Sequence, residues 1–325
     1  MKTKSTKIKQ IPFHQFLEQL FNEAEPVHIA ALYRLSDIDQ SHFEQFQEQW
    51  PPASETRRQT IARHLADISE ENSAVEFSPL FLYLLNDPSP AVRLAALEGL
   101  WDSDNLAVIE PIIQLLITDP QPHVQAAAAS ALGHFVLMGE WGQIASKAKD
   151  KVVNALLAKY DQPELQPEVR RPVLESLSGT THPRIPALID QAYNSDDEQL
   201  QISAVYAMGQ SADKSWLPTI LQEMNSPWPE MRAEAAKAAG NMGSSDALDR
   251  LADLVYDEDL EVRLAGIAAL GQIGGDTAYK LLRRLGDDPE AEELQEAVEE
   301  ALEEMEWLSG EVDLTLMEWD EEEEG

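Results

Sequence analysis

The sequence predicts an all-α protein, an α-solenoid of about nine stacked helical hairpins. Two observations support this fold class. A ten-residue pattern recurs along nearly the whole chain at intervals of about 32 residues, and an apolar, helix-forming segment precedes each clear copy. A hairpin of this size cannot bury its own apolar face, so it must pack against its neighbours in the chain.

The recurring pattern predicts the second helix of each hairpin. Each copy has an apolar residue first, small or apolar residues four and five positions later, and Leu, Met or Ala eight positions later, which is one face of a helix. The clear copies are "VRLAALEGLW" from Val92, "VQAAAASALG" from Val124, "VRRPVLESLS" from Val169, "LQISAVYAMG" from Leu200, "MRAEAAKAAG" from Met231 and "VRLAGIAALG" from Val262. Weaker copies begin at Val27, Arg57 and Leu294.

The first helices are predicted from apolar segments such as "SPLFLYLLND" and "WLPTILQEMNSP", with Asp, Asn, Ser and Pro marking the turns. One interval between copies is longer, 45 residues, and includes the lysine-rich residues 140–162. We expect an extended first helix there. It is either an insertion tolerated at one edge or a contact site for a partner.

The ends of the chain differ from the repeats. We expect four segments: a basic N-terminal lead at 1–10, the repeat solenoid at 11–308, an acidic capping repeat within it at 287–308, and an acidic C-terminal tail at 309–325. From Asp287 onward there are 19 acidic residues and no Lys or Arg. The Ser309-Gly310 pair predicts a helix break, after which the tail is expected either to be disordered or to dock on a basic partner or on the chain itself.

Composition excludes several classes of function. The net charge is −35, and the sequence has no stripe of basic residues. Both features argue against binding to a nucleic-acid backbone. Without cysteine there is no disulfide, thiolate metal site or cysteine nucleophile. No apolar run is long enough for a signal peptide or a membrane span, so we expect a cytoplasmic protein with no membrane partner.

The stretches "DEDLEVRLAGIAALGQIG" and "NDPSPAVRLAALEGL" resemble the HEAT-repeat family, and in particular the short HEAT-like repeats of the phycobilisome (bilin) lyase type. The resemblance implies an armadillo-like superhelix. It implies little about activity, because such repeats occur in many scaffolds and in few enzymes. In the lyases the array holds a tetrapyrrole and a phycobiliprotein, so a bilin lyase, an isomerase or a chaperone-like protein acting on a partner is the alternative function.

In these repeats an acidic residue in the turn between the two helices stands six residues before an arginine at the start of the second helix. A catalytic residue has no reason to repeat, whereas an arginine at a helix start can bridge turn carboxylates of its own and neighbouring hairpins. We therefore predict a structural ladder rather than a site. Its pairs are Asp87 with Arg93, Glu164 with Arg170, and Asp257 with Arg263.

Glycines also recur at one repeat position, at Gly133, Gly209, Gly240 and Gly271. They predict either close helix packing or left-handed helix ends. The stretch "GQIGG" is not a phosphate-binding loop, because no strand precedes it.

Sequence evidence for catalysis is lacking. None of the seven histidines is followed by Glu, whereas the di-iron hydroxylases of the HEAT-repeat family are recognised by repeated His-Glu pairs. We predict no catalytic, cofactor-binding or metal-binding residue and favour a non-catalytic protein over an enzyme.

The second helices are expected to line a concave groove, with outward positions two, six and ten residues after the start of each copy. These positions are mostly small, apolar or neutral, which suits a peptide or a helix better than a polyanion. The alternative for Leu94, Ile202 and Leu264 is packing between repeats. The sequence thus favours a scaffold or adaptor that binds a protein or peptide, with a basic partner one possibility. The candidate groove residues are Leu94, Glu98, His134, Arg171, Glu175, Ile202, Tyr206, Gln210, Lys237, Asn241, Leu264 and Gln272.

Overall fold

The computed structural model describes residues 11–72 and 74–320, without the side chains of residues 289–291 and 308–320. The basic lead at 1–10 lies outside the described residues, as do residues 321–325 of the acidic tail. The described chain is built from α-helices and short 3₁₀ turns and contains no strand. It divides into two compact units, unit 1 from Met1 to Leu177 and unit 2 from Ser178 to Gly325. The predicted all-α helical repeat is confirmed.

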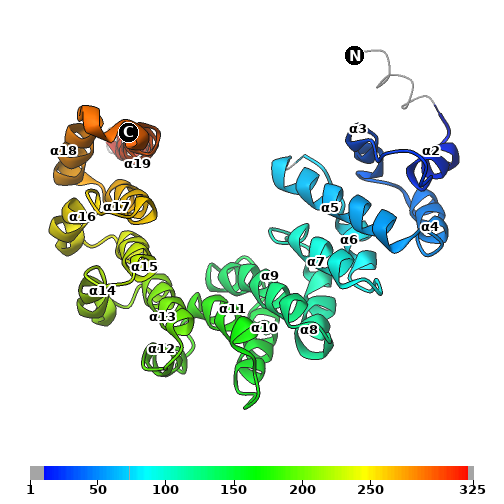
Figure 1. Ribbon diagram of the computed structural model, residues 1–325, viewed down its shortest axis with the longest axis horizontal. Helices are drawn as coiled ribbons and strands as arrows, with labels where there is room; N and C mark the ends of the chain where they lie inside the picture. Colours follow the sequence, from blue (N-terminus) through cyan, green and yellow to red (C-terminus); the bar gives the residue numbers. More distant parts are fainter. Residues whose placement is uncertain (1–10, 73, 321–325) are drawn as a thin grey trace. The chain divides into compact units, whose positions relative to one another are not determined.

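Unit 1 consists of helical hairpins in which α4 pairs with α5, α6 with α7, α8 with α9, and α10 with α11 (Figure 1). Helices α2 and α3 stand in the place of a first hairpin, with α3 much shorter than the later second helices. The bounds are α2 Phe13–Leu20, α3 Ile29–Leu32, α4 Gln40–Gln49, α5 Glu55–Glu71, α6 Ser78–Leu84, α7 Pro90–Glu98, α8 Ile109–Thr118, α9 Pro122–Glu140, α10 Ser146–Tyr160 and α11 Pro167–Ser178.

Unit 2 repeats the same hairpin. Helices α13, α15, α17 and α19 pack side by side in one row, and α12, α14, α16 and α18 form the other (Figure 1). The bounds are α12 Ile185–Tyr193, α13 Glu198–Ser211, α14 Leu217–Glu223, α15 Pro229–Asn241, α16 Leu248–Leu254, α17 Leu260–Ile273, α18 Gly275–Gly286 and α19 Gln295–Asp320.

Local sequence explains where the helices begin. The side chains of Asp197 and Asp259 accept hydrogen bonds from main-chain N–H groups in the first turns of α13 and α17. Helix α15 begins at Pro229, where the missing N–H costs nothing. The apolar face of each helix then packs into the core. Fully buried examples in unit 2 are Val205, Met208, Ile220, Leu251, Ile267 and Leu270.

Two long helices share the lysine-rich interval. The first helix expected there is α10, which has 15 residues and begins at Ser146, and the preceding second helix α9 continues for 19 residues to Glu140. Between them, Gly142 adopts a φ of 73°, a left-handed conformation that glycine allows and that ends the helical path. The extra residues therefore lengthen two helices.

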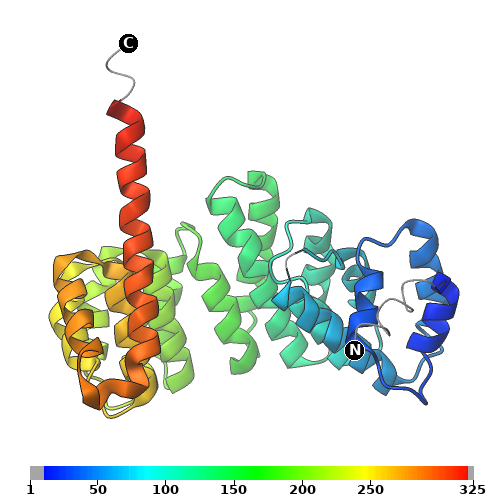
Figure 2. The ribbon, with the colours of Figure 1, turned by 90° about the horizontal axis from the view of Figure 1, so that it is seen from above.

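Helix α19 also differs from the prediction. The expected break at Ser309-Gly310 is absent, because α19 continues for 26 residues to Asp320. A single glycine inside a helix costs only about 1 kcal/mol relative to alanine, which the neighbouring turns can offset. Figure 2 shows α19 projecting past α17 and α18. Its first turns pack on the body through buried Leu294, Val298 and Ala301, as a capping helix would.

Candidate partner-binding surface

The second helices of unit 2 pack unusually close to one another at the repeated glycines. A Cβ atom on Gly209 would lie 2.6 Å from the Cα of Ala238, and one on Gly240 would lie 3.0 Å from the Cα of Ala269. Gly271 repeats this arrangement against α19. None of the three has a positive φ, so the close-packing alternative holds and the left-handed one does not. The row of second helices is thereby fixed backbone against backbone.

The outward positions of these helices reach the surface of unit 2. We call this set the unit 2 strip: Ile202, Tyr206, Gln210, Lys237, Asn241, Leu264 and Gln272. Lys237, Asn241 and Gln272 are exposed, and the other members of the strip are half-buried. The side chains of Ile202 and Leu264 are therefore partly exposed and partly packed within the row of second helices. Lys237 is the only charged member of the strip.

The outward positions of unit 1 have a different character. We call this set the unit 1 strip: Leu94, Glu98, His134, Arg171 and Glu175. Glu98 forms an ion pair with Arg63 of α5, and a ring nitrogen of His134 lies 3.4 Å from a carboxylate oxygen of Asp104. The structure thus distributes the twelve predicted groove residues over two strips, each within its own unit. The unit 1 strip is charged, whereas the unit 2 strip is nearly neutral.

The turn carboxylates of unit 1 bind the arginine of the preceding hairpin. Arg58 of α5 donates to the two carboxylate oxygens of Asp87 at 2.9 and 3.3 Å, and Arg93 of α7 donates to those of Asp119 at 2.7 and 3.0 Å. Arg93 also donates to the main-chain carbonyl of Asp87 at 2.8 Å. The predicted pair of Asp87 with Arg93 is therefore a hydrogen bond to the main chain, whereas the pairs between side chains join neighbouring hairpins.

These pairs are buried, with the carboxylates of Asp87 and Asp119 only 1% and 2% exposed. Trp50 donates to Asp87 as well, at 2.7 Å. We did not predict the role of Arg58 from the sequence, although this residue occupies the arginine position of the weak copy that begins at Arg57. A buried carboxylate depends on such partners, since leaving it unpaired is costly.

In unit 2 one equivalent pair forms and one predicted pair does not. Arg232 donates to Asp257 at 2.8 and 2.7 Å and to the main-chain carbonyl of Ser226 at 3.0 Å. Arg263 instead donates to Glu293 at 2.7 Å, and its buried Nε has no hydrogen-bond partner within the described part of the chain. The direct pair of Asp257 with Arg263 was therefore wrong. Both oxygens of this carboxylate are already held by Arg232.

The pKa of Asp257 reflects this environment. Burial alone would raise it, but the hydrogen bonds from Arg232 and from the main-chain N–H of Asp259, with the arginine charges, lower it below its ordinary value. Hydrogen bonding to Asp257 correspondingly raises the pKa of Arg232. The pair is therefore ionised at neutral pH and fixes the stacking of α15 against the next turn.

The third predicted pair, Glu164 with Arg170, does not form either. Arg170 lies over the ring of Tyr160 at 5.0 Å from its centroid and donates to the main-chain carbonyl of Gln162 at 3.3 Å. Glu164 is exposed in the turn between α10 and α11. An arginine that stacks on an aromatic face needs no carboxylate to be stabilised.

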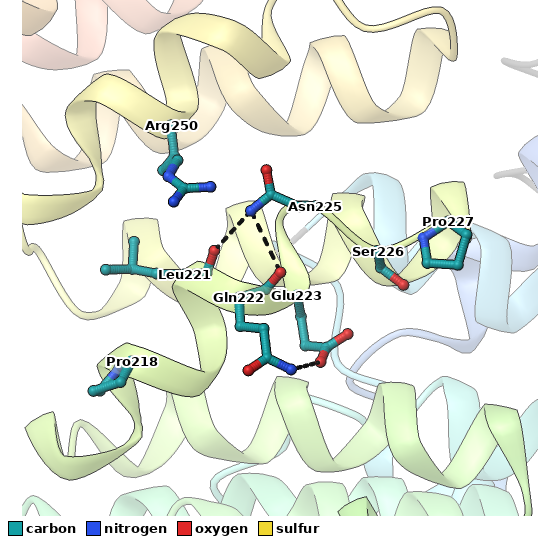
Figure 3. Close-up of a pocket in the computed structure, with 8 residues that line it drawn as sticks. All are labelled: Pro218, Leu221, Gln222, Glu223, Asn225, Ser226, Pro227 and Arg250. Carbon is teal, nitrogen blue, oxygen red and sulfur yellow. Dashed lines mark hydrogen bonds between the residues drawn. The ribbon is translucent and has the colours of Figure 1, made fainter.

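A shallow surface pocket of 540 Å³ opens between the first helices α14 and α16 of unit 2 (Figure 3). Asn225 in this pocket donates to the main-chain carbonyls of Leu221 and Gln222 at 3.3 and 3.5 Å, and Arg250 borders the same space. The amide of Gln222 donates to the carboxylate of Glu223 at 3.4 Å. We did not predict this pocket from the sequence.

Within residues 11–72 and 74–320, no group of three or more His, Asp or Glu side chains is placed to hold a metal ion. The same residues include no helix with the length and apolarity that crossing a bilayer requires.

The model of the HEAT repeats family matches residues 77–178, 185–260 and 217–303. A search of curated proteins finds no match. Similar solved structures include YibA of Escherichia coli, at 17% identity and TM-score 0.43, covering 74% of this chain and 95% of that one. Human deoxyhypusine hydroxylase in complex with glycerol is 18% identical at TM-score 0.36, covering 93% and 96%. An engineered protein is 19% identical at TM-score 0.39, covering 93% and 91%.

All three TM-scores are below 0.5, so we infer nothing about this chain from these structures. The matched model describes HEAT repeats in general, so the finer resemblance to repeats of the bilin lyase type remains a hypothesis.

Proposed function

We propose that this chain, which belongs to the HEAT-repeat family, is a non-catalytic scaffold or adaptor that binds a protein or peptide on the second helices of unit 2. One observation carries the proposal. The unit 2 strip is accessible and contains a single charge, on Lys237, although the whole chain has a net charge of −35. Depletion of charge at the centre of a surface patch is the compositional mark of a protein interface.

The strip also has the rigidity that binding favours. The close contacts of Gly209 and Gly240 hold the second helices against one another, and the pair of Arg232 with Asp257 fixes the turn beside them. A surface built on such helices is pre-organised, so a partner loses less free energy in ordering it. Tyr206, amphipathic and half-buried, is the anchor we expect at its centre.

Acidic residues border the strip and set the charge of the partner. Exposed Glu198, Glu230 and Glu261 stand in the first turns of α13, α15 and α17. Carboxylates beside a neutral strip attract a basic partner and increase its association rate. We therefore infer a partner with an uncharged contact segment and basic residues around it.

The test is a pull-down with the tagged full chain that compares a double variant with a matched control. Tyr206→Ala with Lys237→Ala should reduce partner recovery by about tenfold or more, because an anchor is lost. Far-UV circular dichroism should remain unchanged. The control is Gln222→Ala with Asp249→Ala, at exposed positions of the first helices α14 and α16. Equal losses from both variants would move the binding surface off the second helices.

A further inference from the structure

A glycine followed by a side-chain amide recurs three times in unit 2. The pairs are Gly209-Gln210, Gly240-Asn241 and Gly271-Gln272, each 31 residues after the one before. Each pair lies in the last turn of a second helix, in α13, α15 and α17. The glycine explains the close helix packing, but packing does not explain the amide that follows it.

The three amides are available to a ligand. Asn241 and Gln272 are exposed and Gln210 is half-buried, and none of their side chains hydrogen-bonds to another described residue. A Cβ on Gly240 would collide with the carbonyl oxygen of the Gln272 side chain, so this amide lies over the gap that the glycine leaves. We call the side chains of Gln210, Asn241 and Gln272 the amide column. The glycines set the spacing of this column and leave space for its side chains.

The spacing of the column fits an extended peptide. Packed helices lie about 8 to 10 Å apart, and an extended chain rises about 3.1 to 3.4 Å per residue, so three residues cover about the same distance. A side-chain amide offers one acceptor and two donors, which match the N–H and C=O of a peptide main chain. A bound helix could not use them in this way, because its main-chain groups already bond to one another.

An exposed aspartate follows each amide, just beyond the end of the helix: Asp213 after α13, Asp246 after α15 and Asp276 after α17. These carboxylates would lie beside a peptide held on the column and would attract basic side chains from it. In unit 1 the same register position holds Asp102 and His134, so the column is confined to unit 2.

Resting on the proposed function, we infer that Gln210, Asn241 and Gln272 form an amide column that holds the main chain of an extended, basic partner segment at every third residue. The column recognises the backbone, whereas Tyr206 and the aspartates select among side chains. The ligand is thus an unstructured segment with Lys or Arg near its contact residues.

The experiment begins with a library of random peptides long enough to cross three repeats, selected on the full chain. Selected peptides are then synthesised with single main-chain N-methyl groups, and their affinities are measured by calorimetry. We expect the largest losses at every third residue. Gln210→Ala, Asn241→Ala and Gln272→Ala should each weaken binding about threefold to tenfold, the worth of one or two neutral hydrogen bonds, and the triple variant on the order of a hundredfold. The matched control is Gln191→Ala, an exposed amide on α12, which should bind as the parent does.

The outcomes separate this inference from the proposed function. If Tyr206→Ala with Lys237→Ala abolishes peptide binding while the triple amide variant binds normally, the peptide binds at other residues of the strip and the three amides do not hold it. N-methyl losses without a three-residue period would likewise overturn the column. If no peptide is selected, or if selected peptides bind both the double variant and the triple amide variant unchanged, both the column and the proposed binding surface are wrong.

Discussion

Units 1 and 2 are built from the same hairpin, yet they use their repeat positions differently. In unit 1 the turns carry deeply buried ion pairs, and the outward positions of the second helices are charged and partly paired with one another. In unit 2 the second helices are joined by glycine contacts, and their outward positions are nearly neutral. The comparison teaches that turn and inward positions maintain the stacking, whereas outward positions are free to acquire a binding role.

The largest effect should come from breaking a buried pair in unit 1. Arg93→Ala leaves the carboxylate of Asp119, 2% exposed, without its charged partner, so the free energy of unfolding should fall by about 3 to 5 kcal/mol. Arg263→Ala in unit 2 removes a bond to Glu293, whose side chain is 55% exposed, and should cost under about 1 kcal/mol. Urea unfolding measures both. Equal losses would mean that burial does not distinguish the pairs.

The glycine contacts of unit 2 should give the next largest effect. Gly209→Val would drive a side chain into the backbone of Ala238, and overpacking of this kind costs about 1 to 3 kcal/mol. The matched substitution Ala268→Val, at an exposed outward position of α17, should change stability by under about 0.5 kcal/mol. Thermal unfolding of the two variants would show whether the close approach is needed. A tolerated valine at Gly209 would mean that the row can separate freely.

A smaller effect should appear as a dependence of stability on pH. Because the folded pKa of Asp257 is lowered, its ionised form stabilises unit 2 above the unfolded pKa of about 4, and this contribution is lost as the pH falls through the lower folded value. Asp257→Asn should therefore flatten the acid limb of a plot of unfolding free energy against pH. Arg232→Gln should flatten or reverse this limb, because burial, which raises the pKa of Asp257, is then no longer opposed by the arginine. Identical slopes for the parent protein and Asp257→Asn would contradict a lowered pKa of Asp257 in the folded protein.

The smallest effect on stability should come from the tail. Deleting residues 310–325 should leave the melting temperature nearly unchanged, because the buried contacts of α19 at Leu294, Val298 and Ala301 precede them. Association with a basic partner should slow, and most at low salt, where charges are least screened. Stopped-flow mixing at two salt concentrations measures this. A large drop in melting temperature would show that the segment belongs to the cap.

Much of the fold could be predicted from the sequence because it rests on local periodicity. The apolar spacing that opens at Val262 or Val92 is visible in ten residues and identifies a second helix. Helix ends were less predictable, since Gly310 did not stop α19 and Gly142 did separate α9 from α10. Glycine permits both outcomes, and the packing of neighbouring turns decides between them.

The pairing of side chains was harder to predict than the helices. The spacing of Asp87 and Arg93 recurs along the chain, but Arg58, Arg93 and Arg232 each bind the carboxylate of the next hairpin, which is a non-local choice. Arg57 shows the same difficulty, because it donates to the main-chain carbonyls of Leu20 and Glu25 at 2.6 and 2.7 Å. Carbonyl acceptors have no residue type, so they leave no signal in the sequence.

The central claim, that the second helices of unit 2 bind the partner, is tested most directly by site-specific photo-crosslinking in the full chain. A photoreactive amino acid replaces Lys237 on α15 in one variant and Asp249 on α16 in the other, both exposed positions. We expect a crosslink to a partner protein from position 237, and no crosslink or a far weaker one from position 249. Crosslinks from position 249 with none from position 237 would place the partner on the first helices and contradict the account.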